Sequence, residues 1–308
     1  MTDPNWERQT IEKLAISALQ EQKRARNWSI FFKTLTFLYL FVLLFFALEW
    51  IGPSGNSMGS HTALIDIDGV IGVGEEVNAD NTLSSLRAAF EDKHTKGIIL
   101  RINSPGGSPV QAGIINDEIH RLRKLNPKIP VYAVIEDICA SGGYYIAVAA
   151  DKIYVDKASI VGSIGVLMDG FGFTGVMQKL GVERRLMTAG VNKGFMDPFS
   201  PVNPAHKEHA QAMLDEIHQQ FIAIVREGRG KRLKETPEMF SGLFWSGERA
   251  IDMGLADALG NSDYVAREVI KEENIVDFTA HEGLADRFAK RFGAAAAQSL
   301  VGKEFSLK

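Results

Sequence analysis

The sequence predicts an α/β fold in one folded domain, preceded by a single membrane-spanning helix. Two observations indicate this arrangement. Residues 34–48 carry no charge and are rich in Leu and Phe. After residue 60, short apolar runs rich in β-branched residues alternate with segments of helical period. Such alternation is typical of strand–helix–strand units whose buried strands pair in parallel.

The apolar stretch near the N-terminus is long enough for a membrane anchor. With its flanks it covers residues 31–51 and reaches the roughly 20 residues that a helix needs to cross hydrocarbon. Trp28 and Trp50 stand where interfacial aromatic residues belong. A cleaved signal peptide is the alternative, but about thirty residues precede the stretch and no A-x-A site follows it. We therefore expect an uncleaved anchor in contact with the lipid bilayer.

The charges beside this anchor predict its orientation. Four basic residues precede or open the stretch, namely Lys23, Arg24, Arg26 and Lys33. By the positive-inside rule, the N-terminus lies in the cytoplasm and everything after residue 52 lies across the membrane. We expect a cytoplasmic segment at 1–30, a Gly/Ser linker at 52–60, an exported domain at 61–282 and an Ala-rich tail at 283–308.

The exported domain contains the elements of the predicted fold. Strands are expected at residues 63–67, 97–102, 131–135, 152–156 and 184–187, where apolar and β-branched residues cluster. Helices are expected at residues 81–93, 108–125 and 203–229, where apolar residues recur at helical spacing. An Asn-Pro pair at 126–127 closes the second of these helices.

The composition excludes several classes of function. The chain has 308 residues and a net charge of −4, without the basic excess that is typical of nucleic-acid binding. Its single cysteine, Cys139, allows neither an intrachain disulfide nor a thiolate metal cluster. The seven histidines show no metal-ligand spacing. We therefore expect no nucleic acid, metal or cofactor.

Two glycine-rich turns follow two of the predicted strands. They read INSPGG at 102–107 and ICASGG at 138–143. Ligand sites of parallel sheets form at the carboxyl ends of strands, where a following helix presents free N–H groups. Two such turns side by side would point donors at one oxygen, as an oxyanion hole requires. The alternative is that both turns are ordinary chain reversals.

Ser141, within the second turn, is either a helix N-cap or a nucleophile. A nucleophile needs a base, and no histidine stands in a glycine-rich or apolar context. A neutral lysine also serves, if an apolar site lowers its pKa. Lys193 is the candidate, because Phe195, Met196 and Phe199 lie close to it in a glycine-flanked loop. The alternative is an ordinary solvated loop lysine.

Four motifs together resemble one family. They are NSPGG (103–107), ASGGYYIA (140–147), VGSIGV (161–166) and AGVNKGFMDPFSP (189–201). In this order they are similar to the motifs of the signal peptide peptidase A family of membrane-anchored serine peptidases, in its short single-copy form. The resemblance implies a fold like that of Clp protease and the crotonases, a spiral of ββα units.

The resemblance also implies roles for individual residues. Ser141 would be the acylating nucleophile and Lys193 the general base of a Ser–Lys dyad. Ser163 would hydrogen-bond the lysine and position it. The backbone N–H groups of Gly107 and Gly142 would form the oxyanion hole.

Partners follow from the same resemblance. The substrates would be hydrophobic peptides such as signal peptide remnants, cleaved on the periplasmic face of the bacterial inner membrane. Neighbouring subunits would share each site, which implies a homo-oligomeric ring of eight or four subunits.

Three alternatives remain open from the sequence. A stomatin-operon-type membrane protease is the nearest enzyme, although its serine-to-lysine interval is shorter. A crotonase-like acyl-CoA enzyme would use the same glycine turns with a carboxylate such as Glu136 or Asp137. A non-catalytic membrane scaffold would keep the fold alone.

Overall fold

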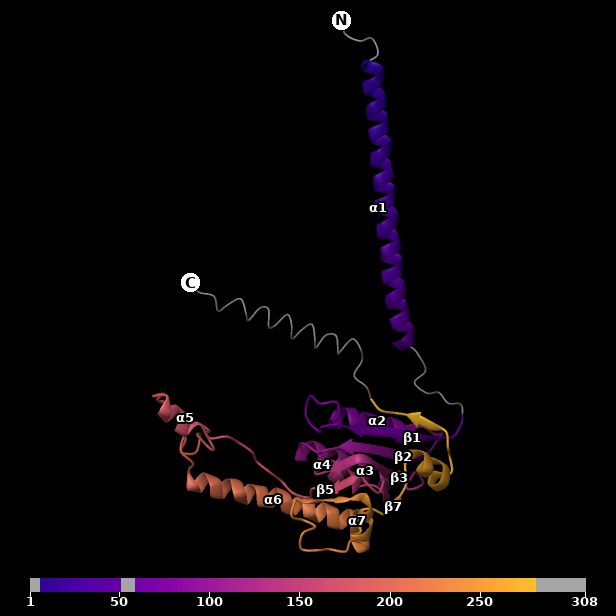
Figure 1. The fold of residues 1–308 in the computed structure, drawn as a ribbon. Coiled ribbons are helices and arrows are strands. Elements are labelled where there is room, and N and C mark those ends of the chain that lie inside the picture. Colours follow the sequence, from indigo (N-terminus) through magenta and orange to yellow (C-terminus); the bar gives the residue numbers. More distant parts are fainter. Residues whose placement is uncertain (1–5, 51–58, 281–308) are drawn as a thin grey trace. The chain divides into compact units, whose positions relative to one another are not determined.

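The computed structural model describes residues 6–50 and 59–280 (Figure 1). The chain divides into two units with a boundary after Asn56, and each is described by itself. The predicted tail at 283–308 and most of the predicted linker at 52–60 lie outside the described residues.

The first unit contains one helix, α1 (Trp6–Trp50). It joins the predicted cytoplasmic segment and the predicted anchor without a break. Among the described residues, this is the one helix that is long and apolar enough to cross a membrane, over Thr10–Leu44. Its Leu and Phe side chains from Phe31 to Leu44 are exposed. The burial expected of a soluble core helix is therefore absent from the described part of α1.

The second unit is built on an eight-stranded sheet, and the predicted α/β fold class is confirmed. The strands are β1 (His61–Asp68), β2 (Thr95–Ser104), β3 (Val131–Ala140), β4 (Lys152–Val155), β5 (Ile160–Gly162), β6 (Phe244–Ser246), β7 (Ala258–Leu259) and β8 (Ile275–Asp277). Their main order is β6-β5-β3-β2-β1-β8, while β4 pairs with β3 and β7. Every pairing is parallel except that of β6 with β5.

Strand β3 is the branching point of the sheet. Its first half pairs with β4 through Tyr132–Val134, and its second half pairs with β5 through Ile138–Ala140. The end of β3 is thereby placed between β2 and β5. The carboxyl ends of β2, β3 and β5 therefore lie side by side at one edge of the sheet.

The helices of the second unit are α2 (Ala79–Glu91), α3 (Pro109–Leu125), α4 (Gly142–Ala147), α5 (Thr174–Lys179), α6 (Pro204–Arg229), α7 (Gly247–Asp252) and α8 (Ser262–Tyr264). Short 3-10 and π-helical segments, η1 (Gly230–Arg232) and η2 (Val265–Ile270), follow α6 and α8. Helices α2 and α3 begin at capping residues, because the side chains of Asn78 and Ser108 accept bonds from backbone N–H groups.

Buried side chains alternate between the two faces of the sheet. Ile98, Leu100 and Ile102 of β2 join the larger core, which includes residues of α2, α3 and α4. Ile99 points to a smaller core that contains Val265 and Ala266 of η2. This period of two follows from the pleat of a strand, and it explains why both faces of the central strands are apolar.

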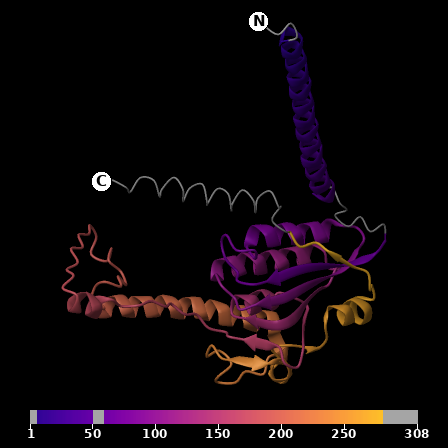
Figure 2. The ribbon, with the colours of Figure 1, turned by 45° about the horizontal axis from the view of Figure 1, so that its top comes forward.

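A long segment leaves the body of the domain between β5 and the core-packed end of α6. We call residues 167–203, together with residues 204–217 of α6, the arm. Both ribbon views place α5 and its surrounding loop at the far end of α6, away from the sheet (Figures 1 and 2). The second half of α6 packs into the core through Phe221, Ile222 and Val225.

The prediction of a strand at residues 184–187 is wrong. These residues are irregular and exposed, and they lie in the arm. No strand of the sheet lies beside them to satisfy a hydrogen-bond ladder, so the apolar pair Leu186 and Met187 has nothing to pack against in a sheet. The other predicted strands and all three predicted helices are present, with ends shifted by a few residues.

Candidate active site at the ends of three parallel strands

The two glycine-rich turns touch each other. Ser104 at the end of β2 pairs with Cys139 near the end of β3, so the chain leaves both strands at the same edge. A Cβ atom on Gly106 would lie 2.7 Å from the Ser141 Cβ and 2.8 Å from the Gly142 nitrogen. Only glycine at position 106 allows this approach.

The turn at Gly107 is held from its other side by the loop after β1. Ile71 donates its N–H to the Gly106 oxygen at 2.9 Å and accepts from the Ser108 N–H at 2.8 Å. Gly107 has a φ of +149°, and a Cβ there would stand 2.1 Å from the Ile71 oxygen. The two bonds of this bridge use the groups on either side of Gly107 and leave its own N–H unused.

The two predicted oxyanion donors are close together. The Gly107 nitrogen lies 3.3 Å from the position that a Cβ on Gly142 would occupy. Gly142 is the first residue of α4, where a backbone N–H has no partner within the helix. The backbone nitrogens of Gly107 and Gly142 therefore lie close to each other beside Ser141.

Ser141 has the backbone of a strained turn. Its φ is 50° and its ψ is −120°, a region that favours glycine, and its side chain makes no capping hydrogen bond. A non-glycine residue in such a region costs about 1–3 kcal/mol. Ser141 therefore stands at the N-cap position without acting as a cap through its hydroxyl. A strained serine between a strand and a helix is also how nucleophile elbows expose their hydroxyl.

Ser163 stands beside Ser141. The pair Ala140–Gly162 closes the register between β3 and β5, and the two serines follow immediately. The Ser141 N–H donates to the Gly162 oxygen at 2.9 Å, and the Ser163 N–H donates to the Leu243 oxygen at 2.7 Å. Ser163 also has a positive φ, of 53°. The structure thus brings together four of the five predicted site residues: Ser141, Ser163, Gly107 and Gly142.

Lys193 does not join this group within one chain. It is exposed in a turn of the arm, where its N–H donates to the Gly190 oxygen at 3.1 Å. Contacts of α6 set the separation. His206 contacts Asn192, next to the lysine, and His218 contacts the oxygen of Ile164, next to Ser163. Twelve helical residues at 1.5 Å each place these two contacts about 18 Å apart.

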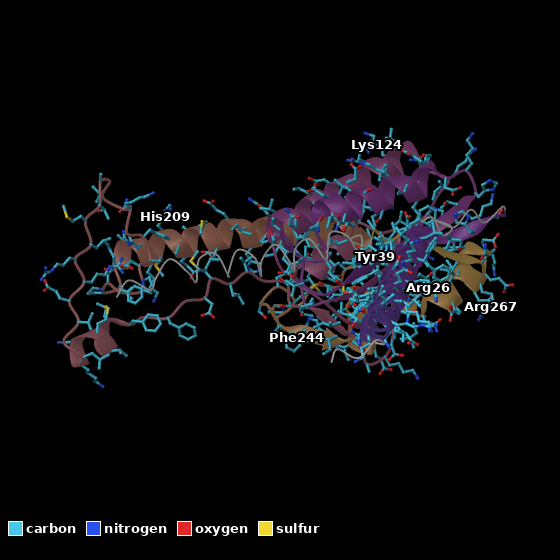
Figure 3. All side chains as sticks on the ribbon, turned by 90° about the horizontal axis from the view of Figure 1, so that it is seen from above. Arg26, Tyr39, Lys124, His209, Phe244 and Arg267 are labelled. Atoms are coloured by element: carbon cyan, nitrogen blue, oxygen red, sulfur yellow. The ribbon has the colours of Figure 1, made fainter. Side chains whose placement is uncertain are left out.

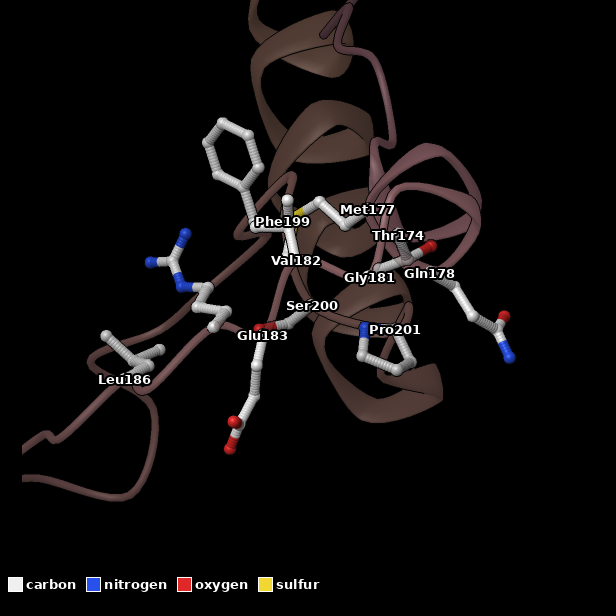
Figure 4. Close-up of a pocket in the computed structure, with 11 residues that line it drawn as sticks. Thr174, Met177, Gln178, Gly181, Val182, Glu183, Leu186, Phe199, Ser200 and Pro201 are labelled. Atoms are coloured by element: carbon white, nitrogen blue, oxygen red, sulfur yellow. The ribbon is translucent and has the colours of Figure 1, made fainter.

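The arm has its own internal order around a cavity of about 530 Å³ (Figure 4). Arg184 pairs with Asp197 at 3.1 Å, and its guanidinium lies over the Phe199 ring, 5.2 Å from the centroid. Asp197 accepts a hydrogen bond of 2.6 Å from the Ser200 hydroxyl, which lowers the pKa of Asp197. This cavity belongs to the arm and is not part of the site at Ser141.

The predicted apolar shield of the lysine is not formed within one chain. Met196 and Phe199 are exposed and Phe195 is half-buried, and Leu167, Phe171 and Met187 elsewhere in the arm are exposed as well. Seen from above, His209 on the arm lies well away from Phe244 at the edge of the sheet (Figure 3). The exposed apolar side chains named above are therefore not covered within their own subunit.

Of the two carboxylates named for the crotonase-like alternative, Glu136 forms an ion pair and Asp137 is exposed. Glu136 lies 3.7 Å from Arg101, which also forms two bonds of 2.6 Å to Asp66. These residues belong to the strands β1, β2 and β3 before the glycine turns.

Sequence reasoning missed two contributors to the site. One is Ile71, whose backbone shapes the Gly107 turn, and the other is Leu243, whose oxygen holds Ser163. The glycine-rich turn after β1 was the one available signal for Ile71, but its contact with position 107 depends on the pairing of β1 with β2. Nothing local marks Leu243.

Comparison with known proteins relates the chain to peptidases. The family model described as Peptidase family S49 matches residues 123–276, which is half of the chain and includes Ser141, Ser163 and Lys193. A putative signal peptide peptidase of Enterococcus faecium is 32% identical over 208 residues, covering 68% of this chain and 60% of that protein. A putative protease of Synechocystis sp. is 30% identical over 214 residues, covering 69% of this chain and 74% of that protein.

A third relative differs in its name. The Na(+)/H(+) antiporter NhaA of Brucella melitensis is 47% identical over 181 residues, which cover 59% of this chain and 24% of that protein. The chain thus spans about a quarter of the length of this relative and 60% of the Enterococcus faecium protein.

Proposed function

Because the chain belongs to peptidase family S49, with the predicted Clp-protease-like α/β fold, we propose that it is a membrane-anchored serine endopeptidase with a Ser141–Lys193 dyad. One observation carries the proposal. Strained Ser141 lies in the second glycine-rich turn, in contact with the first, and the backbone nitrogens of Gly107 and Gly142 lie close together beside it.

The reaction is acyl transfer through Ser141. The neutral amine of Lys193 takes the hydroxyl proton while the Ser141 oxygen bonds to the scissile carbonyl carbon. The carbonyl oxygen becomes an oxyanion that accepts from the N–H groups of Gly107 and Gly142. The lysine then protonates the leaving amine as the C–N bond breaks. Water that gives its proton to the same amine finally releases the acyl group.

Lys193 reaches Ser141 from a neighbouring subunit in this proposal. Two observations support that arrangement: the separation of about 18 Å along α6 within one chain, and the apolar surface of the arm. The apolar side chains of Leu167, Met187 and Val191 are 82%, 93% and 98% exposed. Exposed apolar surface of this extent marks a site of contact with another protein or a membrane. A neighbour that covers them would also desolvate Lys193 and keep its amine neutral. The assembly is a ring of eight or four subunits.

The substrates are hydrophobic peptides such as signal peptide remnants. Leu167, Met168, Phe171 and Phe173 follow directly after the Ser163 turn and supply apolar surface for an extended peptide. The exposed apolar residues of α1 suit insertion in the lipid bilayer. The N-terminus is cytoplasmic, and the catalytic domain acts on the outer face of the bacterial inner membrane. The antiporter match covers a quarter of that protein, so no transport function is proposed.

Active-site labelling tests the nucleophile. The full chain in detergent micelles should react with a fluorophosphonate probe and cleave an apolar reporter peptide. Ser141→Ala should lose both labelling and cleavage, while Lys193→Ala should lose cleavage. Ser60→Ala is the matched control, because Ser60 lies before β1 and far along the chain from the site. Unchanged cleavage by Ser141→Ala would refute the proposal.

Subunit mixing tests where the dyad forms. Ser141→Ala and Lys193→Ala chains are inactive alone, but a mixed ring contains sites with an intact serine from one chain and an intact lysine from its neighbour. Partial recovery of cleavage after mixing is expected. If mixed rings form and stay inactive, the dyad lies within one chain.

A further inference from the structure

We propose that His206 is a positioning residue that holds the loop of the general base Lys193 on helix α6. This inference rests on the proposed Ser141–Lys193 dyad and adds a residue to it. Nε2 of His206 lies 3.2 Å from Oδ1 of Asn192, the residue directly before the lysine. His206 thus contacts the loop at the residue immediately before Lys193.

The same histidine also contacts the loop after the lysine. The ring of Phe195, two residues beyond Lys193, lies 5.1 Å from the His206 ring between centroids. His209, one turn further along α6, meets Phe195 edge-on at 5.8 Å. The first turns of α6 therefore contact the loop on both sides of Lys193, through a polar contact at Asn192 and an aromatic contact at Phe195.

These side-chain contacts matter because the backbone hydrogen bonds on either side of the lysine are confined to short turns. Lys193 donates to Gly190 at 3.1 Å, and Phe195 donates to Asn192 at 3.0 Å. The turn lies between Gly190 and Met196, which have φ values of 105° and 50°. Bonds this local fix the shape of the turn, and the histidine contacts attach the turn to α6.

Helix α6 gives that orientation a fixed reference. Its far end is buried through Phe221, Val225 and Arg229, and His218 contacts the Ile164 oxygen beside Ser163. The loop of the lysine and the turn of Ser163 are thus attached to one continuous helix. Because Lys193 is proposed to reach Ser141 of a neighbouring subunit, a displacement of the loop on α6 changes where the lysine enters that site, and a misplacement of about 1 Å costs on the order of 100-fold in rate.

The chemistry of the contact provides a sharp substitution test. Asn192 Oδ1 is an acceptor, so His206 donates through Nε2. A glutamine places its amide nitrogen near the position of Nε2, whereas an asparagine places its amide nitrogen near that of Nδ1 and does not reach. His206→Gln and His206→Asn are therefore matched variants that differ by one methylene group.

The experiment measures kcat and KM for an apolar reporter peptide with the full chain in detergent. His206→Ala and His206→Asn should lower kcat by 10- to 100-fold with KM within about 2-fold, and His206→Gln should recover to within about 3-fold of wild type. His94→Ala, an exposed histidine outside the arm, is the control and should match wild type. Thermal melting of each variant is recorded in parallel.

A double substitution keeps the test decisive if His206→Ala also affects stability. Asn192→Ala removes the same hydrogen bond from the other side, so the effects of Asn192→Ala and His206→Ala on kcat should not add. Additive effects, or equal kcat for the Gln and Asn variants, would overturn the proposal. Full kcat in His206→Ala beside an inactive Lys193→Ala would overturn the positioning role alone. An active Lys193→Ala would overturn the proposed function and this inference together.

Discussion

Ser141 and Ser163 are the first residues beyond the last paired positions of β3 and β5, and both have φ values near 50°. The Ser141 N–H is bonded to the residue before Ser163, so the two strained turns support each other. A non-glycine residue with a positive φ lowers the stability of the fold, and here two such residues lie side by side. Such strain persists only where the contacts of the surrounding structure hold the backbone in place. Stability and activity should therefore oppose each other at this edge of the sheet.

Ser141→Gly should raise stability and abolish cleavage. Glycine adopts the observed φ without strain, which removes about 1–3 kcal/mol, while its greater freedom in the unfolded chain returns about 0.5–1 kcal/mol. The expected net gain is about 1 kcal/mol in the free energy of unfolding, measured by denaturant titration. Ser141→Ala retains a Cβ and is the control, because it should show no gain. A glycine variant less stable than the alanine variant would contradict this interpretation.

Gly107→Ala should abolish acylation. The new Cβ would stand 2.1 Å from the Ile71 oxygen, so the loop after β1 or the oxyanion turn must move. Labelling by a fluorophosphonate should fall by at least about 100-fold, the usual effect of losing an oxyanion donor. Gly113→Ala in α3 is the matched control, since nothing lies within 4 Å of its Cβ position. That control should be stabilised by about 0.5–1 kcal/mol and keep full labelling.

Arg229→Met should destabilise the domain by about 3–5 kcal/mol, because it removes the buried arginine of an ion pair and leaves half-buried Asp257 without its main partner. Arg229 is 1% exposed and pairs with Asp257 at 2.8 Å. Burial raises the pKa of Asp257, but the hydrogen bond and charge of Arg229 outweigh burial and lower it. Arg226→Met is the control, because its pair with Glu235 is exposed and contributes at most about 1 kcal/mol. Equal unfolding midpoints for the two variants would contradict the prediction.

Glu118→Gln should lower the free energy of unfolding at neutral pH, and this difference from wild type should disappear in acid. Hydrogen bonds from Arg121, followed by those from Arg87, lower the pKa of Glu118 from 4.5 to about 2. A carboxyl with a lowered pKa stabilises the fold above its unfolded pKa and loses this contribution as pH falls through the folded pKa. The variant should be about 1–2 kcal/mol less stable at pH 7.

Denaturant titrations between pH 7 and pH 3 check the sign of this effect. The difference between wild type and Glu118→Gln should shrink below pH 4.5, the ordinary pKa of the side chain. Exposed Glu216 on α6 provides the control, and Glu216→Gln should show no such pH dependence. A difference that grows toward acid pH would have the wrong sign.

Much of the fold was predictable because its signals are local. The apolar run of β2 and the capped period of α3 mark a strand and a helix without reference to the rest of the chain. The short strands β5 to β8 were not all predictable, because two or three residues carry no periodicity and form a strand only where a neighbour pairs with them. The same reason explains the wrong strand at residues 184–187, where apolar residues have no neighbouring strand.

The sequence by itself determined the residue types of the candidate site. Two glycine-rich turns after strands, a serine in one of them and a lysine in a glycine-flanked loop are readable from local chemistry. Only the tertiary structure decided which of them meet. Parallel pairing of β2, β3 and β5 places Ser141, Ser163, Gly107 and Gly142 at one edge. In its own chain, Lys193 lies in the arm, on a loop that contacts α6 at His206, whereas the turn of Ser163 contacts α6 at His218, about 18 Å further along the helix. Spacing along the chain contains no record of this separation, because it depends on how an arm and a sheet are joined in space.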